Sequence, residues 1–524
     1  MNLLSDKLLK IINDRRFAIS VLFLMLLTGR IFLLTQFSFK YTCSDDLIFW
    51  QSASDYLRGI FHEPYFYGQN YNFMLESLPA IPMLAIGLPH FMALPLSTLL
   101  FALFPFLLFS FVLFRNGHDL AACIFLLIPL TLPIEYDMVT SMTRGFISGI
   151  FFTGFLVYCL LNPYGIKSYI ILGLTVSVSY ILNPNSLVLS FPVSLYLLFE
   201  NYNKPLFYWI PVLFAIPFFS LEYYARQFYI SNPEFLVHKA WEMKFSMDLM
   251  LDGFLHMDRF FGYLTPVFWK GNWVVLPVIL ILAIKLMKTN WKKGLSLALS
   301  VVFFLGLMGM HKVNDGMDTI FFTSVRMFLG IPLVLGVGMF WLTNTVKFNE
   351  RLWTRVILGI GCIVLFIKIL ETKSVIQKHT ELKNHGSIAL SSIEDLKKRC
   401  AEWKERIRQY DADLIVYVVD WKYGVPELEF YNYACPLLES ELPQSIINVF
   451  ERRTWIFVDE KDHSRDRVLI FNPNIDSLPE ITPSLKYERI EGRPNLILIT
   501  ENDKSLSELS ELFHFGLMRN TYVY

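Results

Sequence analysis

The sequence predicts a polytopic α-helical membrane protein with a C-terminal α/β domain. Hydrophobic residues make up 54% of the 524-residue chain and aromatic residues 16%, and they come in long blocks separated by short basic clusters. These blocks end near residue 370, after which the chain is polar with short strand and helix patterns. We therefore expect about 11 transmembrane helices in residues 1–370 and an extracytoplasmic α/β domain in residues 371–524.

The charge balance and the cysteines exclude two other classes of protein. Basic and acidic residues each number 46, so the chain has no basic surplus for nucleic acid. Six cysteines form no spacing typical of a disulfide framework. Cys400 and Cys435 could pair in an oxidising compartment, although two unpatterned cysteines do not by themselves predict a bond.

The N-terminal segment sets the predicted orientation. Lys7, Lys10, Arg15 and Arg16 place it in the cytosol by the positive-inside rule. The hydrophobic stretch that follows is too long for a signal peptide and lacks a small-residue cleavage site. We expect it to remain in the membrane as an anchor and to deliver the next loop to the outside.

The short apolar stretch 78–89 decides the predicted topology. It contains Pro79, Pro82 and Pro89 and has about a dozen residues, whereas a span needs roughly 20. If it is re-entrant, the later loops with clustered lysine or arginine lie in the cytosol and the C-terminal domain lies outside. The expected spans are 17–36, 91–114, 120–133, 146–161, 169–182, 187–199, 206–221, 274–286, 295–310, 321–342 and 356–370.

The C-terminal region reads as alternating strands and helices. Short apolar runs predict buried strands at 414–419, 454–458, 468–471 and 496–500. Helical patterns begin at Ser392 and again at residue 505. The alternation is typical of a small α/β domain.

The first outer loop, residues 37–90, carries the most informative polar pattern. It begins with adjacent carboxylates, Asp45 and Asp46, and continues with apolar residues at helical spacing from 47 to 61. A loop that only joins two spans has no use for paired acids at the membrane surface, so we interpret it as one wall of an active site. The alternative is that the acids cap the following helix, a natural role for Ser44 and Asp45.

The order of these parts resembles the GT-C superfamily of integral membrane glycosyltransferases, in the branch of protein O-mannosyltransferases and the bacterial lipid A aminoarabinose transferase. The resembling features are the first span, the acid pair with its amphipathic helix, the re-entrant stretch and the outward C-terminal domain. Two short motifs add to it: Gly68-Gln69 and Ser324-Val325-Arg326-Met327-Phe328.

Three positions depart from the family's pattern. The second acid of its Asp-Glu pair is Asp46 here, and its Arg-Tyr is Arg326-Met327. Its Lys-Pro-Pro stretch is here Glu76-Ser77-Leu78-Pro79. These departures concern the acceptor class more than the chemistry.

The resemblance implies a sugar donor carried on a polyprenyl phosphate, used on the extracytoplasmic face with inversion. The acceptor would be a lipid, a glycan or a protein. Such a displacement needs a base near the acceptor and cations for the departing phosphate. Asp45 or Asp46 is the expected base, with Asp45 favoured by its place in the family's pair. The carboxylates suit a divalent metal, but the branch resembles the metal-independent members, so no cofactor is expected.

Four basic residues are candidates for binding the donor phosphate. Arg144 lies in the second outer loop beside two acids, and the alternative is an interfacial arginine–acid pair. Arg326 lies near the outer end of an apolar helix, where its fork geometry suits a phosphate and snorkelling is the alternative. His311 and Lys312 in the preceding loop could add charge to the same phosphate.

Further residues are predicted to contact the substrate. An aromatic face and an amide in the first outer loop suit a sugar, with loop packing as the alternative. An aromatic-rich segment of the loop 222–272 suggests a stretch that lies on the membrane beside the acceptor, and plain interfacial anchoring is the alternative. The predicted contacts are Tyr67, Gln69, Glu135, Asp137, Asp258 and Arg259.

Three rival functions were weighed against the enzyme. A flippase or transporter for a lipid-linked sugar predicts mid-span ionisable groups and repeat symmetry, whereas the charges here cluster at outer helix ends. A glycan polymerase or ligase is harder to exclude, although such proteins usually lack the early acid pair. A membrane-anchored binding protein would not need eleven spans. The expected location is a bacterial inner membrane, among membrane lipids, with the N-terminus cytosolic.

Overall fold

The computed structural model forms two compact units. It describes residues 15–65, 67, 72–235, 244–269, 272–314, 316, 320, 323–381, 390–418, 426–439, 442–447, 453–471, 478–492 and 495–515. Unit 1 comprises Met1–Phe39, Tyr71–Tyr223 and Trp241–Ile388, and unit 2 comprises Lys40–Asn70, Tyr224–Ala240 and Ala389–Tyr524. The first outer loop is therefore divided between the units near residue 70.

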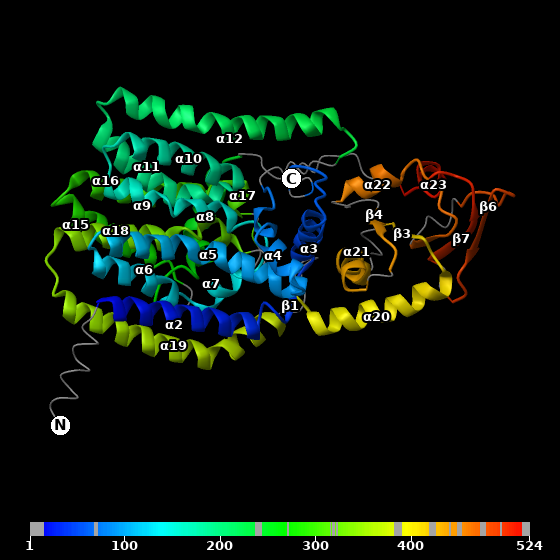
Figure 1. Cartoon of the computed structure of the whole chain (residues 1–524), viewed down its shortest axis with the longest axis horizontal. Coiled ribbons are helices and arrows are strands. Elements are labelled where there is room, and N and C mark those ends of the chain that lie inside the picture. Colours follow the sequence, from blue (N-terminus) through cyan, green and yellow to red (C-terminus); the bar gives the residue numbers. More distant parts are fainter. Residues whose placement is uncertain are drawn as a thin grey trace. The chain divides into compact units, whose positions relative to one another are not determined.

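Unit 1 is a helical bundle (Figure 1). Its elements are α2 (Arg15–Gln36), η1 (Leu75–Ser77), α4 (Ala80–Ala85), α5 (His90–Arg115), α6 (Asp119–Thr131), α7 (Ile134–Val139), α8 (Ser148–Thr153), α9 (Leu156–Leu161), α10 (Ile166–Leu182), η2 (Pro184–Ser186), α11 (Leu187–Asn201), α13 (Met247–Leu255), α14 (Asp258–Phe261), α15 (Val275–Met287), α16 (Trp291–Leu307), α17 (His311–Asn314), η3 (Ser324–Phe328), α18 (Ile331–Thr345) and α19 (Glu350–Glu381). Helix α12 (Pro205–Ser231) begins in unit 1 and ends in unit 2.

The first and last long helices of the bundle lie side by side. Helix α2 packs along α19, and both pack against α6 (Figure 1). Helix α18 is buried on almost all sides, whereas α12 is mostly exposed. Apolar side chains on both kinds of helix are expected in a membrane, where lipid covers what the protein does not.

Within the described residues, each segment that the sequence predicted to span the membrane is mostly helical. In the part of the chain that the structure describes, five helices are long and apolar enough to cross a bilayer: Arg16–Gln36, His90–Arg115, Pro205–Ser231, Ser324–Thr345 and Glu350–Thr380. The expected span 146–161 is divided into α8 and α9. The expected re-entrant stretch forms only the six-residue helix α4, far shorter than the roughly 20 residues that a crossing needs.

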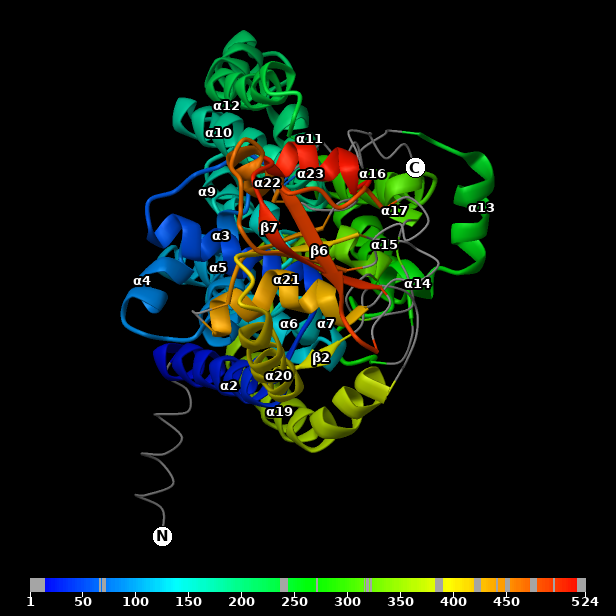
Figure 2. The same ribbon diagram turned by 90° about the vertical axis from the view of Figure 1, so that its right-hand side faces the viewer.

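Unit 2 is built around a mixed five-stranded sheet with the order β4-β3-β5-β7-β6. Strand β3 (Leu414–Tyr417) is parallel to β4 (Ser445–Ile447) and β5 (Val468–Phe471). Strand β7 (Leu496–Asn502) is antiparallel to β5 and to β6 (Leu485–Arg489), as Figure 2 shows for β6 and β7. Buried aliphatic side chains run through the three central strands, so the sheet carries the core of this unit.

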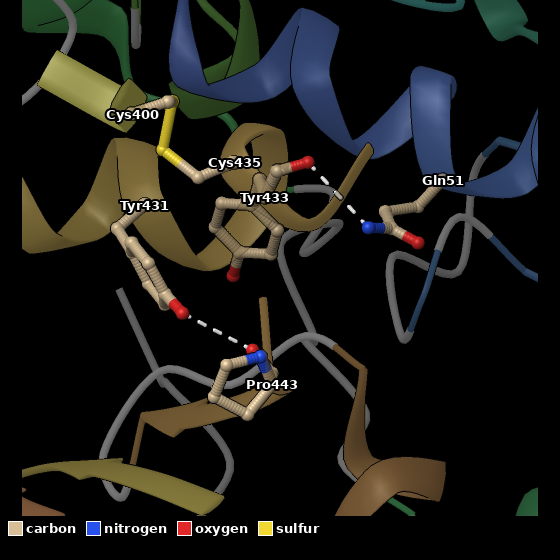
Figure 3. The surroundings of a disulfide bond; sticks show 6 residues. All are labelled: Gln51, Cys400, Tyr431, Tyr433, Cys435 and Pro443. Atoms are coloured by element: carbon tan, nitrogen blue, oxygen red, sulfur yellow. Dashed lines mark hydrogen bonds between the residues drawn. A yellow bond between two sulfur atoms is a disulfide. The ribbon is translucent and has the colours of Figure 1, made fainter. Parts of the chain in front are cut away.

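The helices of unit 2 include one from the first outer loop. Helix α3 (Ser44–Leu57) packs against α21 (Pro426–Leu438), which packs in turn against α20 (Ile393–Tyr410). Strand β1 (Tyr41–Thr42), directly before α3, pairs with β2 (Ser391–Ser392), directly before α20. A disulfide between Cys400 and Cys435 joins α20 to α21 (Figure 3). The acid-bearing segment and the C-terminal residues thus share one unit.

One predicted strand is wrong. Residues 454–458 belong to helix α22 (Thr454–Glu460), in which Trp455 and Ile456 are buried. A short apolar run does not distinguish a strand from a buried helical turn. The pattern also missed other elements of the unit, among them β4, which has three residues, β6, which buries only Leu485, and α21, which has a proline at its first position and another near its end. The predicted β3, β5, β7, α20 and α23 (Leu506–Leu512) are present.

Candidate functional site

Two of the predicted phosphate-binding arginines lie on one aromatic ring in unit 1. The guanidinium carbon of Arg326 is 5.0 Å from the centre of the Phe146 ring, and that of Arg144 is 5.7 Å from the same centre. Both arginines are almost completely buried. Arginines that stack on a ring are pre-organised to offer their N–H groups to an anion. We define this cluster of Arg144, Phe146 and Arg326 as the arginine site.

The loop that carries Arg144 and Phe146 is held by polar side chains from other segments. Asn72 donates from Nδ2 to the carbonyl of Arg144 at 3.4 Å. Gly145 has φ +76°, and a Cβ there would lie 1.9 Å from Nδ2 of Asn72. Glycine is therefore required, both for the left-handed backbone and for the close approach of Asn72.

Two asparagines from the turn η2 join the loop to the late arginine. Asn185 donates from Nδ2 to the carbonyl of Phe146 at 2.7 Å and to that of Arg326 at 3.2 Å. Asn183 donates from Nδ2 to the carbonyl of Gly145 at 3.4 Å. The sequence analysis predicted no role in the site for these two asparagines. The signal for more was two amides flanking Pro184 between apolar helices, since buried amides need partners.

The arginine motif itself forms the 3₁₀ turn η3 that leads into α18. Thr323 accepts the backbone N–H of Val325 through its Oγ1, at 3.3 Å, and all five residues of η3 are buried. Helices α14 and α17 both contact η3. Two other predicted phosphate ligands, His311 and Lys312, lie on α17, with His311 exposed and Lys312 half-buried. The two predicted arginines thus meet on Phe146, whereas His311 and Lys312 lie on a short helix that contacts η3.

The predicted substrate contact Arg259 holds a neighbouring loop. Its guanidinium donates to the carbonyls of Asn314 at 2.6 Å and Gly316 at 2.5 Å. Asp258, beside it on α14, is exposed. Because α14 packs against η3, these contacts fix the chain just before the arginine motif.

The acids beside the second outer loop lie in a buried charge cluster. Asp137 forms an ion pair with Arg30, with 2.9 Å between Oδ1 and a guanidinium nitrogen, and a second ion pair with Lys368. Arg30 also donates to Thr140 at 2.8 Å. The cluster therefore ties α2, α7 and α19 together, which suits its burial because charges in a low-dielectric interior require partners. Sequence reasoning missed Arg30 and Lys368 as partners of Asp137, although each is the only cation within the expected span that contains it.

The second acid of this region has a weaker partner. Glu135 lies 3.8 Å from Nε2 of the buried His379, measured from its Oε1. The pair joins α7 to the C-terminal end of α19. Both predicted substrate contacts, the buried Asp137 and the half-buried Glu135, thus face partners within the protein.

The acid pair opens helix α3 in unit 2. Asp45 and Asp46 lie in the first turn, with Asp46 buried and Asp45 half-buried. The N-cap residue is Cys43, and no side chain caps the helix. The acids are therefore inside the helix, where negative charge is favourable near the N-terminus, rather than at the cap position that sequence reasoning offered as their alternative role.

A third carboxylate of α3, which sequence reasoning missed, organises the loop that follows. The buried Asp55 accepts from the hydroxyl of Tyr67 at 2.8 Å and from the guanidinium of Arg58. His62 lies 3.6 Å from the same carboxylate and stacks on Trp455 with the ring centres 3.6 Å apart. Tyr67 is buried, and burial together with Asp55 raises its pKa well above the ordinary value. Gln69, the other predicted sugar contact, lies outside the described residues.

Neither unit holds a metal-binding cluster within the part of the chain that the structure describes. There, no group of three or more His, Cys, Asp or Glu side chains could hold a metal ion. The chemistry proposed below is built from arginines and carboxylates alone.

Two solved structures share the fold of this chain. The crystal structure of ArnT from Cupriavidus metallidurans in the apo state aligns with TM-score 0.52 and 11% identity, covering 91% of this chain and 97% of that chain. The structure of ArnT bound to undecaprenyl phosphate aligns with TM-score 0.51 and 10% identity over the same shares. No family model and no curated protein sequence matches the chain. The GT-C-like fold expected from the sequence is confirmed, and at this identity the likeness concerns the fold alone.

Proposed function

We propose that this protein is a membrane glycosyltransferase that takes its sugar from a polyprenyl-phosphate donor and transfers it to a lipid, glycan or protein acceptor. The observation that carries the proposal is the arginine site, where two guanidiniums from distant parts of the sequence stack on Phe146. Undecaprenyl phosphate bound to ArnT, which shares the fold, supports the choice of a polyprenyl phosphate.

The arginine site would bind the phosphate of the donor. Charge-assisted hydrogen bonds from a guanidinium fork are among the strongest that a protein offers to phosphate oxygens. Two such groups stabilise the charge that develops on the phosphate as the sugar leaves. Asn185, bonded to the backbone of both Phe146 and Arg326, supports this role because it fixes the spacing of the two segments.

Helix α3 would supply the base, with Asp45 the first choice and Asp46 the second. An acceptor hydroxyl attacks the anomeric carbon while the bond from that carbon to the phosphate oxygen breaks. The hydroxyl proton passes to the aspartate, and polyprenyl phosphate leaves with inversion. No metal takes part in this scheme, which relies on a positioned base and positioned cations.

The reaction would take place on the extracytoplasmic face of a bacterial inner membrane. The eleven-span topology expected from the sequence would place the N-terminus in the cytosol and unit 2 outside. The Cys400–Cys435 disulfide supports that placement, because such bonds persist in oxidising compartments and are rare in the cytosol.

A second candidate function, transport of a lipid-linked sugar, is favoured by one observation. Arg30, Asp137 and Lys368 form a buried ionic cluster on apolar helices, and ionisable groups within the membrane often mark transport pathways. Because these charges are paired with one another, the enzyme remains the better-supported function.

The test uses purified protein in liposomes with a panel of radiolabelled polyprenyl-phosphate sugars and membrane extract as acceptor. We expect label to move from one donor to the acceptor fraction, with release of polyprenyl phosphate. Arg326→Ala should bind the donor more weakly, whereas Lys486→Ala, in an exposed ion pair of β6, should behave as wild type. If the labelled donor crosses the bilayer and no sugar is transferred, the result would favour the transporter over the enzyme.

A further inference from the structure

Glu76 is a fully buried carboxylate that the proposed reaction does not use. One oxygen, Oε1, accepts from the backbone N–H groups of Ile147 and Ser148, both at 3.2 Å. The other, Oε2, accepts from the hydroxyl of Thr98 at 3.1 Å. All these donors are neutral, so the carboxylate is solvated by hydrogen bonds from the protein itself.

The bonded amides belong to the loop that forms the arginine site. Ile147 directly follows Phe146, the ring on which both arginines stack. The hydroxyl of Thr98, which donates to Glu76, also shares a hydrogen bond with the hydroxyl of Thr143 at 2.9 Å, directly before Arg144, and there Thr143 is the donor because Thr98 has only one hydroxyl proton. Glu76 and Thr98 therefore hold the loop on both sides of the Arg144–Phe146 segment.

Glu76 is itself held in place from the backbone. Its carbonyl accepts from the hydroxyl of the buried Ser97 on α5. Helix α5 is a long apolar helix of the bundle, so the loop is attached through Glu76 to a rigid element. A carboxylate with no freedom to move is suited to positioning other groups.

We propose that Glu76 is a positioning residue of the arginine site, which holds the backbone of residues 143–148 so that Arg144 and Phe146 face Arg326. Its role in phosphate binding rests on the proposed function. The positioning acts through hydrogen-bond acceptance and reach, not through the charge of the carboxylate on the arginines.

This assignment separates three substitutions. In Glu76→Gln the amide oxygen still accepts from both backbone N–H groups, and Thr98 can accept from the amide nitrogen instead of donating. In Glu76→Asp the charge stays but the side chain is one methylene too short to reach the loop. In Glu76→Ala all three hydrogen bonds are lost. Glu200→Gln, elsewhere in unit 1 where Glu200 pairs with Lys292, serves as the matched control.

The first measurement is hydrogen exchange of the peptide that spans residues 145–150 in the detergent-solubilised protein. Two backbone N–H groups lose their acceptor together, and the joint loss of two hydrogen bonds should speed exchange about 10- to 100-fold. We expect this in Glu76→Ala and Glu76→Asp, and wild-type exchange in Glu76→Gln and Glu200→Gln. If Glu76→Ala exchanges as slowly as wild type, the proposal is overturned.

The second measurement is binding of undecaprenyl phosphate to the same proteins. Glu76→Ala and Glu76→Asp should bind about 10-fold more weakly, and Glu76→Gln within a few-fold of wild type. Loss of affinity in Glu76→Gln with a protected loop would show that charge is what matters, and would refute positioning. If wild type binds no undecaprenyl phosphate, the proposed function fails, while the exchange result still decides whether Glu76 holds the loop.

Discussion

The arginine site of unit 1 and the acid-bearing helix of unit 2 are stabilised by different kinds of contact. The loop that bears Arg144 is held by buried polar side chains that bond to its backbone, namely Asn72, Glu76, Asn183 and Asn185. Helix α3 is held by apolar residues from Leu47 to Ala53 and by α21, which a disulfide joins to α20. Directional hydrogen bonds set the position of a few atoms, whereas apolar packing spreads its free energy over many.

Because their contacts differ, the two regions should differ in their sensitivity to single substitutions. Removing one hydrogen-bonding side chain should disturb the arginine site locally, with little effect on the rest of the bundle. Helix α3 should keep its structure when a single polar side chain is substituted. A substitution of a polar residue in its first turn should therefore change the rate of sugar transfer and not the fold. Four measurements test whether the two regions differ in this way.

The largest expected effect is on chemistry at α3. Asp45→Asn removes the proposed base but keeps the shape of the side chain, so sugar transfer should fall by about 10²- to 10⁴-fold. Binding of undecaprenyl phosphate should stay unchanged, because the arginine site is intact. Asp46→Asn is the matched control and should retain more activity. If Asp46→Asn is the more damaging change, the base is Asp46, and equal transfer by all three proteins would remove both acids from the mechanism.

The next effect is on phosphate binding at the arginine site. Arg326→Ala should weaken the binding of undecaprenyl phosphate by roughly 10- to 150-fold, the range of a hydrogen bond to a charged group. Arg326→Lys keeps the charge but loses the planar fork and the stacking on Phe146, so we expect an intermediate loss. Equilibrium binding in nanodiscs measures both. A lysine variant as tight as wild type would show that net charge, not geometry, binds the phosphate.

The third effect is on the stability of unit 2. Replacing Cys400 and Cys435 together by serine should lower the free energy of unfolding of unit 2 by about 2–4 kcal/mol, because a disulfide restricts the unfolded chain. Hydrogen exchange should rise in α20, α21 and α3, and the peptide 145–150 of unit 1 should not change. Cys362→Ser, which alters an exposed free cysteine, should have no effect. A rise in unit 1 as large as that in unit 2 would contradict the independence of the two regions.

The smallest effect is a pH dependence near His62. Burial lowers the pKa of this imidazole from 6.5, although Asp55 and Asp459 oppose the shift. The unfolded state therefore binds the proton more readily, so the stacked contact is most stable above about pH 6.5 and weakens as pH falls below it. Exchange of α22, corrected for intrinsic rates, should show this loss. In His62→Phe the stack on Trp455 remains and the pH dependence should disappear, and a wild-type profile in that variant would assign it to another group.

Several parts of the fold could be read from patterns along the chain. The long apolar blocks predicted helices because their length and composition leave few alternatives in a membrane. The helix that starts at Ser44 and the strands β3, β5 and β7 were likewise local patterns. Residues 454–458 were misread because a threonine followed by four apolar residues fits a strand and a buried helical turn equally well.

The functional residues divide along the same line. Arg144 and Arg326 were predicted because charge at the end of an apolar segment is costly and therefore informative. That they meet on Phe146 was not predictable, because 182 positions separate them in sequence and no local pattern records which helices become neighbours.

The sequence alone predicted a helical membrane protein and the positions of its apolar helices. It also indicated which charged residues at the ends of apolar segments are candidates for a functional role. Only the tertiary structure decided what those charges face. In the folded protein Asp137 pairs with Arg30 and Lys368, and Asp55 accepts a hydrogen bond from Tyr67. Glu76 accepts hydrogen bonds from backbone amides of a loop that is distant in sequence. The reason is physical: hydrophobic periodicity is set by neighbours along the chain, whereas the partner of a buried polar group is set by which segments the packed fold brings together.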